Sequence, residues 1–96
     1  MTVGQICKSL QGHDKDALYM VVAVESDGFV RVVDGKYKKQ TNPKRKNQKH
    51  LSALKCVFQD YVTAKEAGKK IPDCEIMHYL KTLSASKNFN GGESSV

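Results

Sequence analysis

The pattern of apolar and polar residues over the first third of the chain predicts short β-strands. Residues 18–24 form a nearly continuous apolar run rich in β-branched side chains, which is typical of a strand covered on both faces. Asp27 and Gly28 separate this run from residues 29–33 and predict a tight hairpin turn, because Asp-Gly readily takes positive φ angles. We therefore expect strands at residues 3–10, 18–24 and 29–33.

The strand pattern weakens after residue 33. Asp34 and Gly35 repeat the turn signal, and residues 36–39 predict an edge strand whose lysines discourage pairing with another chain. Pro43 ends that strand, since proline cannot donate to a ladder, and residues 44–50 predict a basic loop. Several strands joined by tight turns favour a small β-barrel.

The second half of the chain predicts two helices. Ser52 is a suitable N-cap for the first helix and Gly68 a suitable stop, while Asp73 can cap the second. The apolar residues at helical spacing are Leu54, Val57, Phe58, Tyr61 and Val62 in the first helix, and Ile76, Met77, Leu80 and Leu83 in the second. The predicted organisation is mainly β with an α extension: a barrel and basic loop over residues 1–51, a helical extension over 52–85, and a disordered tail over 86–96.

Positive charge is concentrated in the middle of the chain. The formal net charge is +6, yet no acid occurs between Gly35 and Gln59. The basic run, residues 36–49, contains Lys36, Lys38, Lys39, Lys44, Arg45, Lys46 and Lys49. A patch of this kind favours anionic partners, above all the phosphates of nucleic acid.

Other function classes find little support in the sequence. The three cysteines, Cys7, Cys56 and Cys74, are widely spaced and lack any C-x-x-C pair, which suits buried or reduced thiols in the cytoplasm. Cys74 and His78 would share a helix face and provide half of a zinc site, but no second pair completes it. We expect no membrane span, no metal or cofactor, no small-molecule substrate and no catalysis.

Two segments of the N-terminal half resemble a known family. Residues 4–8, 12–15 and 21–24 look like a KOW motif, and residues 34–39 followed by 42–51 resemble the small bacterial KOW-domain RNA-binding proteins. Those proteins are related to a group of eukaryotic and archaeal large-subunit ribosomal proteins. The resemblance covers residues 3–51, about half the chain. The KOW-like segment and the segment after it occur here in the same order as in that family.

The resemblance implies an SH3-like barrel and RNA binding. The motif glycine corresponds to Gly12, and His13, Asp14 and Lys15 form the loop that presents to RNA. Family members continue with glycine where this chain has Asp16, so an acid lies beside Lys15 and weakens it as a contact.

We therefore predict a non-catalytic RNA-binding protein of the cytoplasm, which binds structured RNA, with ribosomal RNA as the expected ligand, through the Lys/Arg-rich edge strand and loop. Its candidate RNA-binding residues are His13, Lys15, Lys36, Tyr37, Lys38, Lys39, Lys44, Arg45, Lys46, Lys49 and His50. Lysine and arginine would contact phosphates, whereas Tyr37 and His50 are candidates for stacking on bases. Tyr37 alone is more typical of a half-buried strand residue.

Two alternatives stay open at this level. The basic run can be a solvated face, or it can steer a protein-interaction adaptor whose helices dock on a protein partner. Attachment to anionic lipid ranks last, because neither predicted helix combines a basic face with a strong apolar one.

Overall fold

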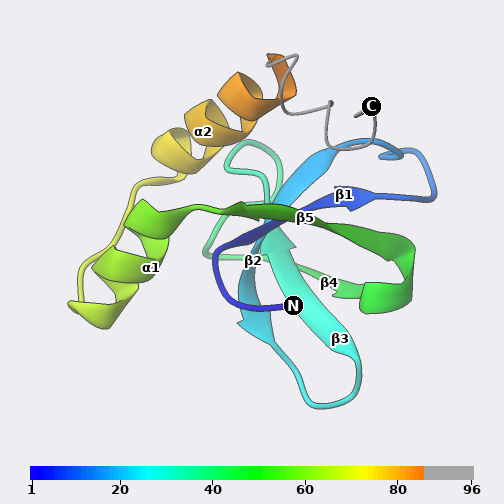
Figure 1. Ribbon diagram of the computed structural model, residues 1–96, viewed down its shortest axis with the longest axis horizontal. Coiled ribbons are helices and arrows are strands. Elements are labelled where there is room, and N and C mark those ends of the chain that lie inside the picture. Colours follow the sequence, from blue (N-terminus) through cyan, green and yellow to red (C-terminus); the bar gives the residue numbers. More distant parts are fainter. Residues whose placement is uncertain (86–96) are drawn as a thin grey trace.

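The structure, a computed structural model, describes residues 1–85 and consists of one five-stranded antiparallel sheet and two C-terminal helices (Figure 1). The elements are β1 (Gln5–Ser9), β2 (Leu18–Val24), β3 (Phe29–Val33), β4 (Lys44–Asn47), the 3₁₀ turn η1 (Gln48–His50), β5 (Leu51–Val57), α1 (Gln59–Glu66) and α2 (Asp73–Ala85). The strands expected at 18–24 and 29–33 are confirmed at those bounds, and the first strand is confirmed over a shorter range. The predicted disordered tail, residues 86–96, lies outside the described residues.

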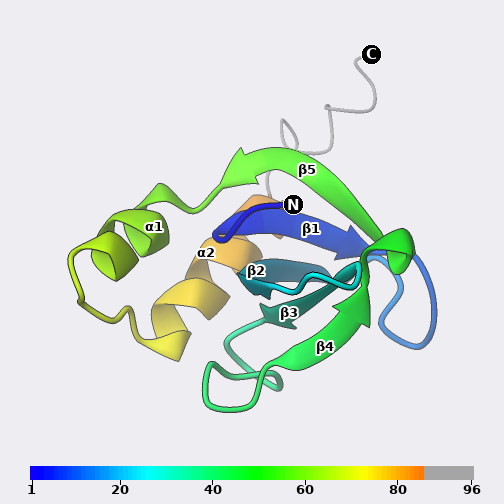
Figure 2. The same cartoon turned by 90° about the horizontal axis from the view of Figure 1, so that it is seen from below.

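The strands are ordered β4-β3-β2-β1-β5, so β4 and β5 are the two outer strands. Only η1 joins them, although in a flat sheet the outer strands would lie about 19 Å apart, at ~4.8 Å per spacing. The four steps from Asn47 to Leu51 reach at most about 14 Å even when fully extended. The sheet must therefore curl, and Figure 2 shows the end of β4 brought round to the start of β5. Within residues 1–85, no ladder closes the sheet between them.

Two expectations about the basic run are wrong. Residues 36–39 form a turn rather than an edge strand, because Asp34 organises their backbone in place of a neighbouring strand. The predicted basic loop over residues 44–50 is instead β4 followed by η1. β4 contains no apolar residue, and it forms because the open edge of β3 offers it a backbone ladder, with Val30 opposite Lys46.

The helix predicted to begin at Ser52 is also wrong over its first turns. Residues 51–57 form β5, which pairs with β1 and places Leu54 and Cys56 against the core. Ala53 and Val57 on the other face are exposed. The apolar spacing fits both a helix and a strand, and the free edge of β1 decides between them. Residues 52–57 thus belong to the sheet and not to a helical extension.

The ends of the helices agree better with the sequence. Gly68 follows α1 with φ +75°, and Lys69 N donates to the Ala64 carbonyl at 2.7 Å, so the predicted stop is confirmed. α2 begins at Asp73 as expected, and its Ile76 and Leu80 are buried. The Asp73 carboxylate, however, accepts hydrogen bonds from Gln40 rather than capping its own helix.

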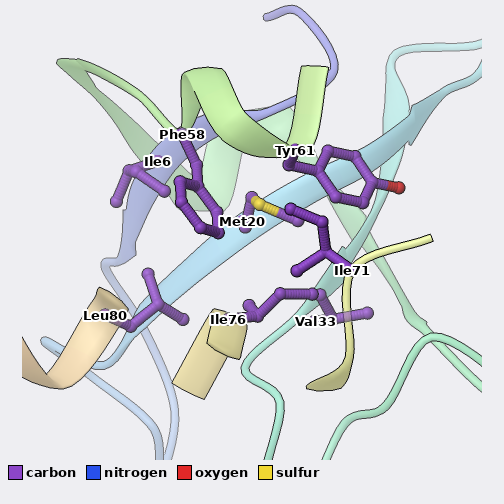
Figure 3. Close-up of a cluster of buried hydrophobic side chains, with 8 residues drawn as sticks. All are labelled: Ile6, Met20, Val33, Phe58, Tyr61, Ile71, Ile76 and Leu80. Atoms are coloured by element: carbon purple, nitrogen blue, oxygen red, sulfur yellow. The ribbon is translucent and has the colours of Figure 1, made fainter. Parts of the chain in front are cut away.

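Side chains pack on both faces of β2, as expected for a doubly covered strand. On one face, the helices and three strands enclose a cluster of Ile6, Met20, Val33, Phe58, Tyr61, Ile71, Ile76 and Leu80 (Figure 3). On the other face, within the curl of the sheet, lie Cys7, Tyr19, Val21, Val30, Val32 and Leu51. The helices therefore complete a second apolar layer on the sheet and position the loop that follows β3.

Gly35 lets the β3–β4 connection approach α2. Its φ is +79°, and a Cβ there would collide with the Asp73 carbonyl oxygen and lie 2.6 Å from Met77 N. Side-chain and backbone hydrogen bonds of Gln40 to Asp73 and Ile71 hold the same connection to the start of α2. Figure 2 shows it between β4 and the N-terminal end of this helix.

Candidate nucleic-acid interface

Asp34 shapes the first part of the basic run. Its Oδ1 accepts the backbone N–H groups of Lys36, Tyr37 and Lys38 at 2.8–2.9 Å, and its own N–H donates to the Lys38 carbonyl. Three parallel bonds to one carboxylate oxygen fix the turn without a neighbouring strand. The turn leaves the Tyr37 side chain 75% exposed, so the half-buried strand position expected for it is wrong.

Arg45 is neutralised on the outer side of the β3–β4 pair. Its Nε donates to Glu25 at 2.8 Å, it also pairs with Asp27, and its guanidinium lies 3.8 Å from the centre of the Phe29 ring. Glu25 additionally accepts from Arg31, which lies directly opposite Arg45 across the two strands. Hydrogen bonds from the two arginines hold the pKa of Glu25 below its ordinary value. The two acids cancel the charge of the two arginines, so Arg45 offers little net charge to a phosphate.

Lys46 points inward and serves a different purpose from its neighbours. Its side chain is only 12% exposed, and its Nζ donates to Asp14 Oδ2 at 2.7 Å and to the hydroxyl of buried Ser9 at 3.2 Å. The Tyr19 hydroxyl donates to the same carboxylate oxygen at 2.7 Å, and the Ser9 hydroxyl donates to Oδ1 at 2.9 Å. This polar cluster of Ser9, Asp14, Tyr19 and Lys46 ties the β1–β2 loop to β4.

Burial alone would raise the pKa of Asp14, but the hydrogen bonds from Lys46, Tyr19 and Ser9 outweigh it and hold that pKa well below its usual range. Burial, reinforced by the bond to Asp14, raises the pKa of Tyr19. The carboxylate is therefore ionised and occupied by donors at neutral pH.

An open hollow of about 490 Å³ lies beside the polar cluster, and we call it the basic hollow. Four chain segments contribute basic side chains to it: the β1–β2 loop gives His13, the β3–β4 connection gives Lys38, β4 gives Lys44 and η1 gives His50. Asp14 is the acid among the lining residues, and Lys46 neutralises it. The remaining lining residues are Gln11, Gly12 and Tyr19. The fold thus converts residues far apart in sequence into one concave basic surface.

The other candidate residues lie outside this hollow. Lys36 and Tyr37 face α2, where they share a smaller depression with Met77 and Lys81. Lys39 and Lys49 are exposed, and Lys15 is exposed on the β1–β2 loop beside Asp16. Within residues 1–85, the five bases of the run other than Arg45 and Lys46 make no ion pair, namely Lys36, Lys38, Lys39, Lys44 and Lys49.

Asp16 has the backbone of a glycine. Its φ of +72° is the one positive φ outside glycine within the described part of the chain. Its N–H donates to the Ser9 carbonyl at 2.8 Å, which closes the β1–β2 loop. A left-handed residue is required here, so glycine at this position in the resembling family would serve the same backbone.

Sequence reasoning missed two parts of this surface. The first is the polar cluster around Asp14. Its carboxylate accepts hydrogen bonds from side chains of β1, β2 and β4, and nothing in the sequence next to Asp14 indicates these contacts. Three lysines at the turn between α1 and α2, Lys65, Lys69 and Lys70, line a further hollow. Their clustering around Gly68 is visible in the sequence, but Asp60, Glu66, Asp73 and Glu75 lie nearby, so this part of the chain shows no excess of positive charge.

Metal and membrane features receive no support within residues 1–85. No group of three or more His, Cys, Asp or Glu side chains there is placed to hold a metal ion, and no helix is long and apolar enough to cross a membrane.

Cys7 is buried and Cys56 half-buried, but Cys74 is exposed on α2, so its expected burial is wrong. The chain matches no protein-family model, and no curated protein matches it either.

The polar cluster predicts a specific dependence of stability on acid. The folded-state pKa of Asp14 lies below the unfolded-state value of about 3.9, so its contribution to stability is complete above that value and is lost as the pH falls. We expect the free energy of unfolding to fall more steeply between about pH 5 and pH 2 in the wild type than in Asp14→Asn. Urea midpoints measured across this range test the difference, and parallel curves would contradict it.

Proposed function

We propose that the protein binds RNA, with ribosomal RNA as its expected ligand, through the basic hollow and the neighbouring lysines of the basic run. The observation that carries the proposal is the convergence of His13, Lys38, Lys44 and His50 from four segments around a hollow whose acid is already neutralised. A concave surface with unopposed lysines can follow a phosphate backbone, and phosphate contacts supply most sequence-independent affinity.

We further propose that the sheet is an SH3-like barrel of the KOW type. The curl imposed by η1 and the pairing of β5 with β1 support this assignment. The left-handed backbone of Asp16, where the resembling family has glycine, supports the likeness at the motif loop itself. The loop that carries His13 is the one through which the family resemblance implies RNA contact.

The ion pairs alter which residues we assign to phosphate. Lys36, Lys38, Lys39, Lys44 and Lys49 are the proposed phosphate contacts, whereas Arg45 and Lys46 hold the surface together. Lys15 remains a weak contact beside Asp16. Tyr37, exposed and next to Lys38, is the proposed stacking residue, since unpaired bases commonly stack on aromatic rings.

Titration of a fluorescein-labelled RNA against salt tests the proposal. Five phosphate contacts predict that log affinity falls with log salt at a slope of about −3.5 to −4.5. The double variant Lys38→Gln, Lys44→Gln should lower the affinity about tenfold at 0.15 M salt, because each lost contact removes roughly 0.7 from the slope.

The matched control is Lys8→Gln, Lys55→Gln, which removes the same charge from lysines on β1 and β5 that line none of the three hollows. It should lower the affinity much less. Equal losses in the two double variants would show that net charge, and not this surface, drives binding.

Crosslinking in cells followed by sequencing of the recovered RNA tests the identity of the ligand. Enrichment of one ribosomal RNA region is expected. The rival hypothesis, a protein-interaction adaptor steered by its charge, predicts no RNA enrichment above background and a protein partner whose capture survives in the Lys38→Gln, Lys44→Gln variant.

A further inference from the structure

A second open hollow, of about 750 Å³, lies at the turn between α1 and α2, and we call it the helical hollow. Lys65, Lys69 and Lys70 line it, together with the aromatic ring of Tyr61. The Lys65 ammonium group lies 6.0 Å from the centre of that ring. Figure 3 shows the Tyr61 hydroxyl directed away from the buried cluster to which its ring belongs.

The end of α1 brings the three lysines together. Gly68, in its left-handed conformation, reverses the chain directly after the last helical turn, and buried Ile71 anchors the returning segment. Lys65 in that last turn and Lys69 and Lys70 beyond it therefore meet at one hollow, where all three are exposed.

One acid, Asp73, lines the helical hollow, and neutral amide donors hold its carboxylate without cancelling its charge, so three lysines face one carboxylate there. Asp73 Oδ1 accepts the backbone N–H of Gln40 at 3.0 Å and its side-chain amide at 3.1 Å. Within the part of the chain that the structure describes, none of the three lysines forms an ion pair. Their positive charge is therefore available to an external anion.

The two hollows share one wall. Lys38 and Lys44 line the basic hollow, while Gln40 and Thr41 between them line the helical hollow. Two residues of extended chain span at most about 7 Å, so the Lys38 backbone at the basic hollow lies within that distance of the Gln40 backbone at the helical hollow. Asp34 at its start and the Gln40–Asp73 bonds in its middle keep it in place.

We propose that an RNA strand bound in the basic hollow continues across residues 38–44 into the helical hollow, where Lys65, Lys69 and Lys70 contact its phosphates. This inference rests on the proposed function. It enlarges the RNA-binding surface to both sides of the β3–β4 connection and gives the helices a share in the binding. On both sides of the connection, the lysines that line the hollow, Lys46 apart, form no ion pair within residues 1–85, so they can contact phosphate.

The test compares Lys69→Gln, Lys70→Gln with Lys8→Gln, Lys55→Gln, whose lysines line neither hollow. The probes are fluorescein-labelled single-stranded RNAs of random sequence, about 4 and about 16 nucleotides long, the limits of site size in small single-strand-binding barrels. For the longer RNA, we expect the helical-hollow variant to reduce the salt slope by about 1.4 and the affinity roughly tenfold at 0.15 M salt. Wild-type protein should bind the longer RNA more tightly than the shorter one. We expect this difference in affinity to be smaller in the helical-hollow variant and unchanged in the control.

The outcomes separate this inference from the proposed function. If Lys38→Gln, Lys44→Gln weakens binding but Lys69→Gln, Lys70→Gln behaves like the control, the strand does not enter the helical hollow and the inference is overturned alone. If wild-type protein binds neither RNA, or if no variant differs from the control, both the proposed function and the inference fall.

Discussion

Gly35→Ala is expected to lower the melting temperature by about 8–40 °C, because its two costs add to about 2–5 kcal/mol and each kcal/mol shifts the midpoint by about 4–8 °C. A Cβ at this position meets backbone atoms of α2, the Asp73 carbonyl oxygen and Met77 N, which cannot rotate away as a side chain would. Forcing α2 outward costs about 1–3 kcal/mol for overpacking. The φ of +79° adds about 1–2 kcal/mol for an L-residue in the left-handed region.

Gly28→Ala is the matched control for that experiment. Gly28 has a similar φ of +87°, but a Cβ there would meet nothing within 4 Å. The control therefore carries the backbone strain without the collision, and its loss of stability should be about 1–2 kcal/mol. Thermal unfolding followed by circular dichroism measures both. Equal losses would mean that α2 yields to the methyl group and that its contact with the β3–β4 connection is loose.

Lys46→Met is expected to destabilise the protein by about 2–3 kcal/mol, less than the 3–5 kcal/mol typical of a fully buried pair. The substitution keeps the apolar length of the side chain but removes the ammonium group that pairs with Asp14. Asp14 keeps 30% of its side chain exposed, so water partly compensates the loss. Urea denaturation at about pH 7 measures the effect, and a loss below about 0.5 kcal/mol would show that the pair is a weak surface contact.

The double variant Asp14→Asn, Lys46→Met separates two roles for Lys46. If Lys46 acts on RNA by neutralising Asp14, the single Lys46→Met variant loses RNA affinity and the double variant regains most of it. If Lys46 itself contacts phosphate, the double variant stays as weak as the single one. Our structural assignment expects recovery of both stability and affinity.

The sequence predicted the strands that carry their own signal. Residues 18–24 and 29–33 are apolar, β-rich and joined by Asp27-Gly28, so local chemistry alone specifies them. β4 has no such signal, because a strand of four polar residues exists only on the edge that β3 provides. β5 was obscured by an apolar spacing that suits a helix equally well, and pairing with β1 across some fifty residues decided the outcome.

The sequence named the candidate residues but not how they come together. That Lys38 and Lys44 of the basic run share one hollow with His13 of the β1–β2 loop follows from the fold and has no signal in the sequence. Which bases are free was not predictable, because Arg45 pairs with acids 18 and 20 residues away and Lys46 with an acid 32 residues away. Tyr37 was misjudged for a related reason: Asp34 turned its segment out of the sheet.

The pairing of β1 with β5 also determines the order in which this chain can fold. β2 and β3 need only residues 18–33 and form a hairpin from local contacts, which close quickly. β1 gains its second neighbour only when β5 is available, since Leu51 pairs with Ser9 and Val57 with Gln5. During synthesis, therefore, the edge of β1 that pairs with β5 stays open until residues 51–57 have left the ribosome.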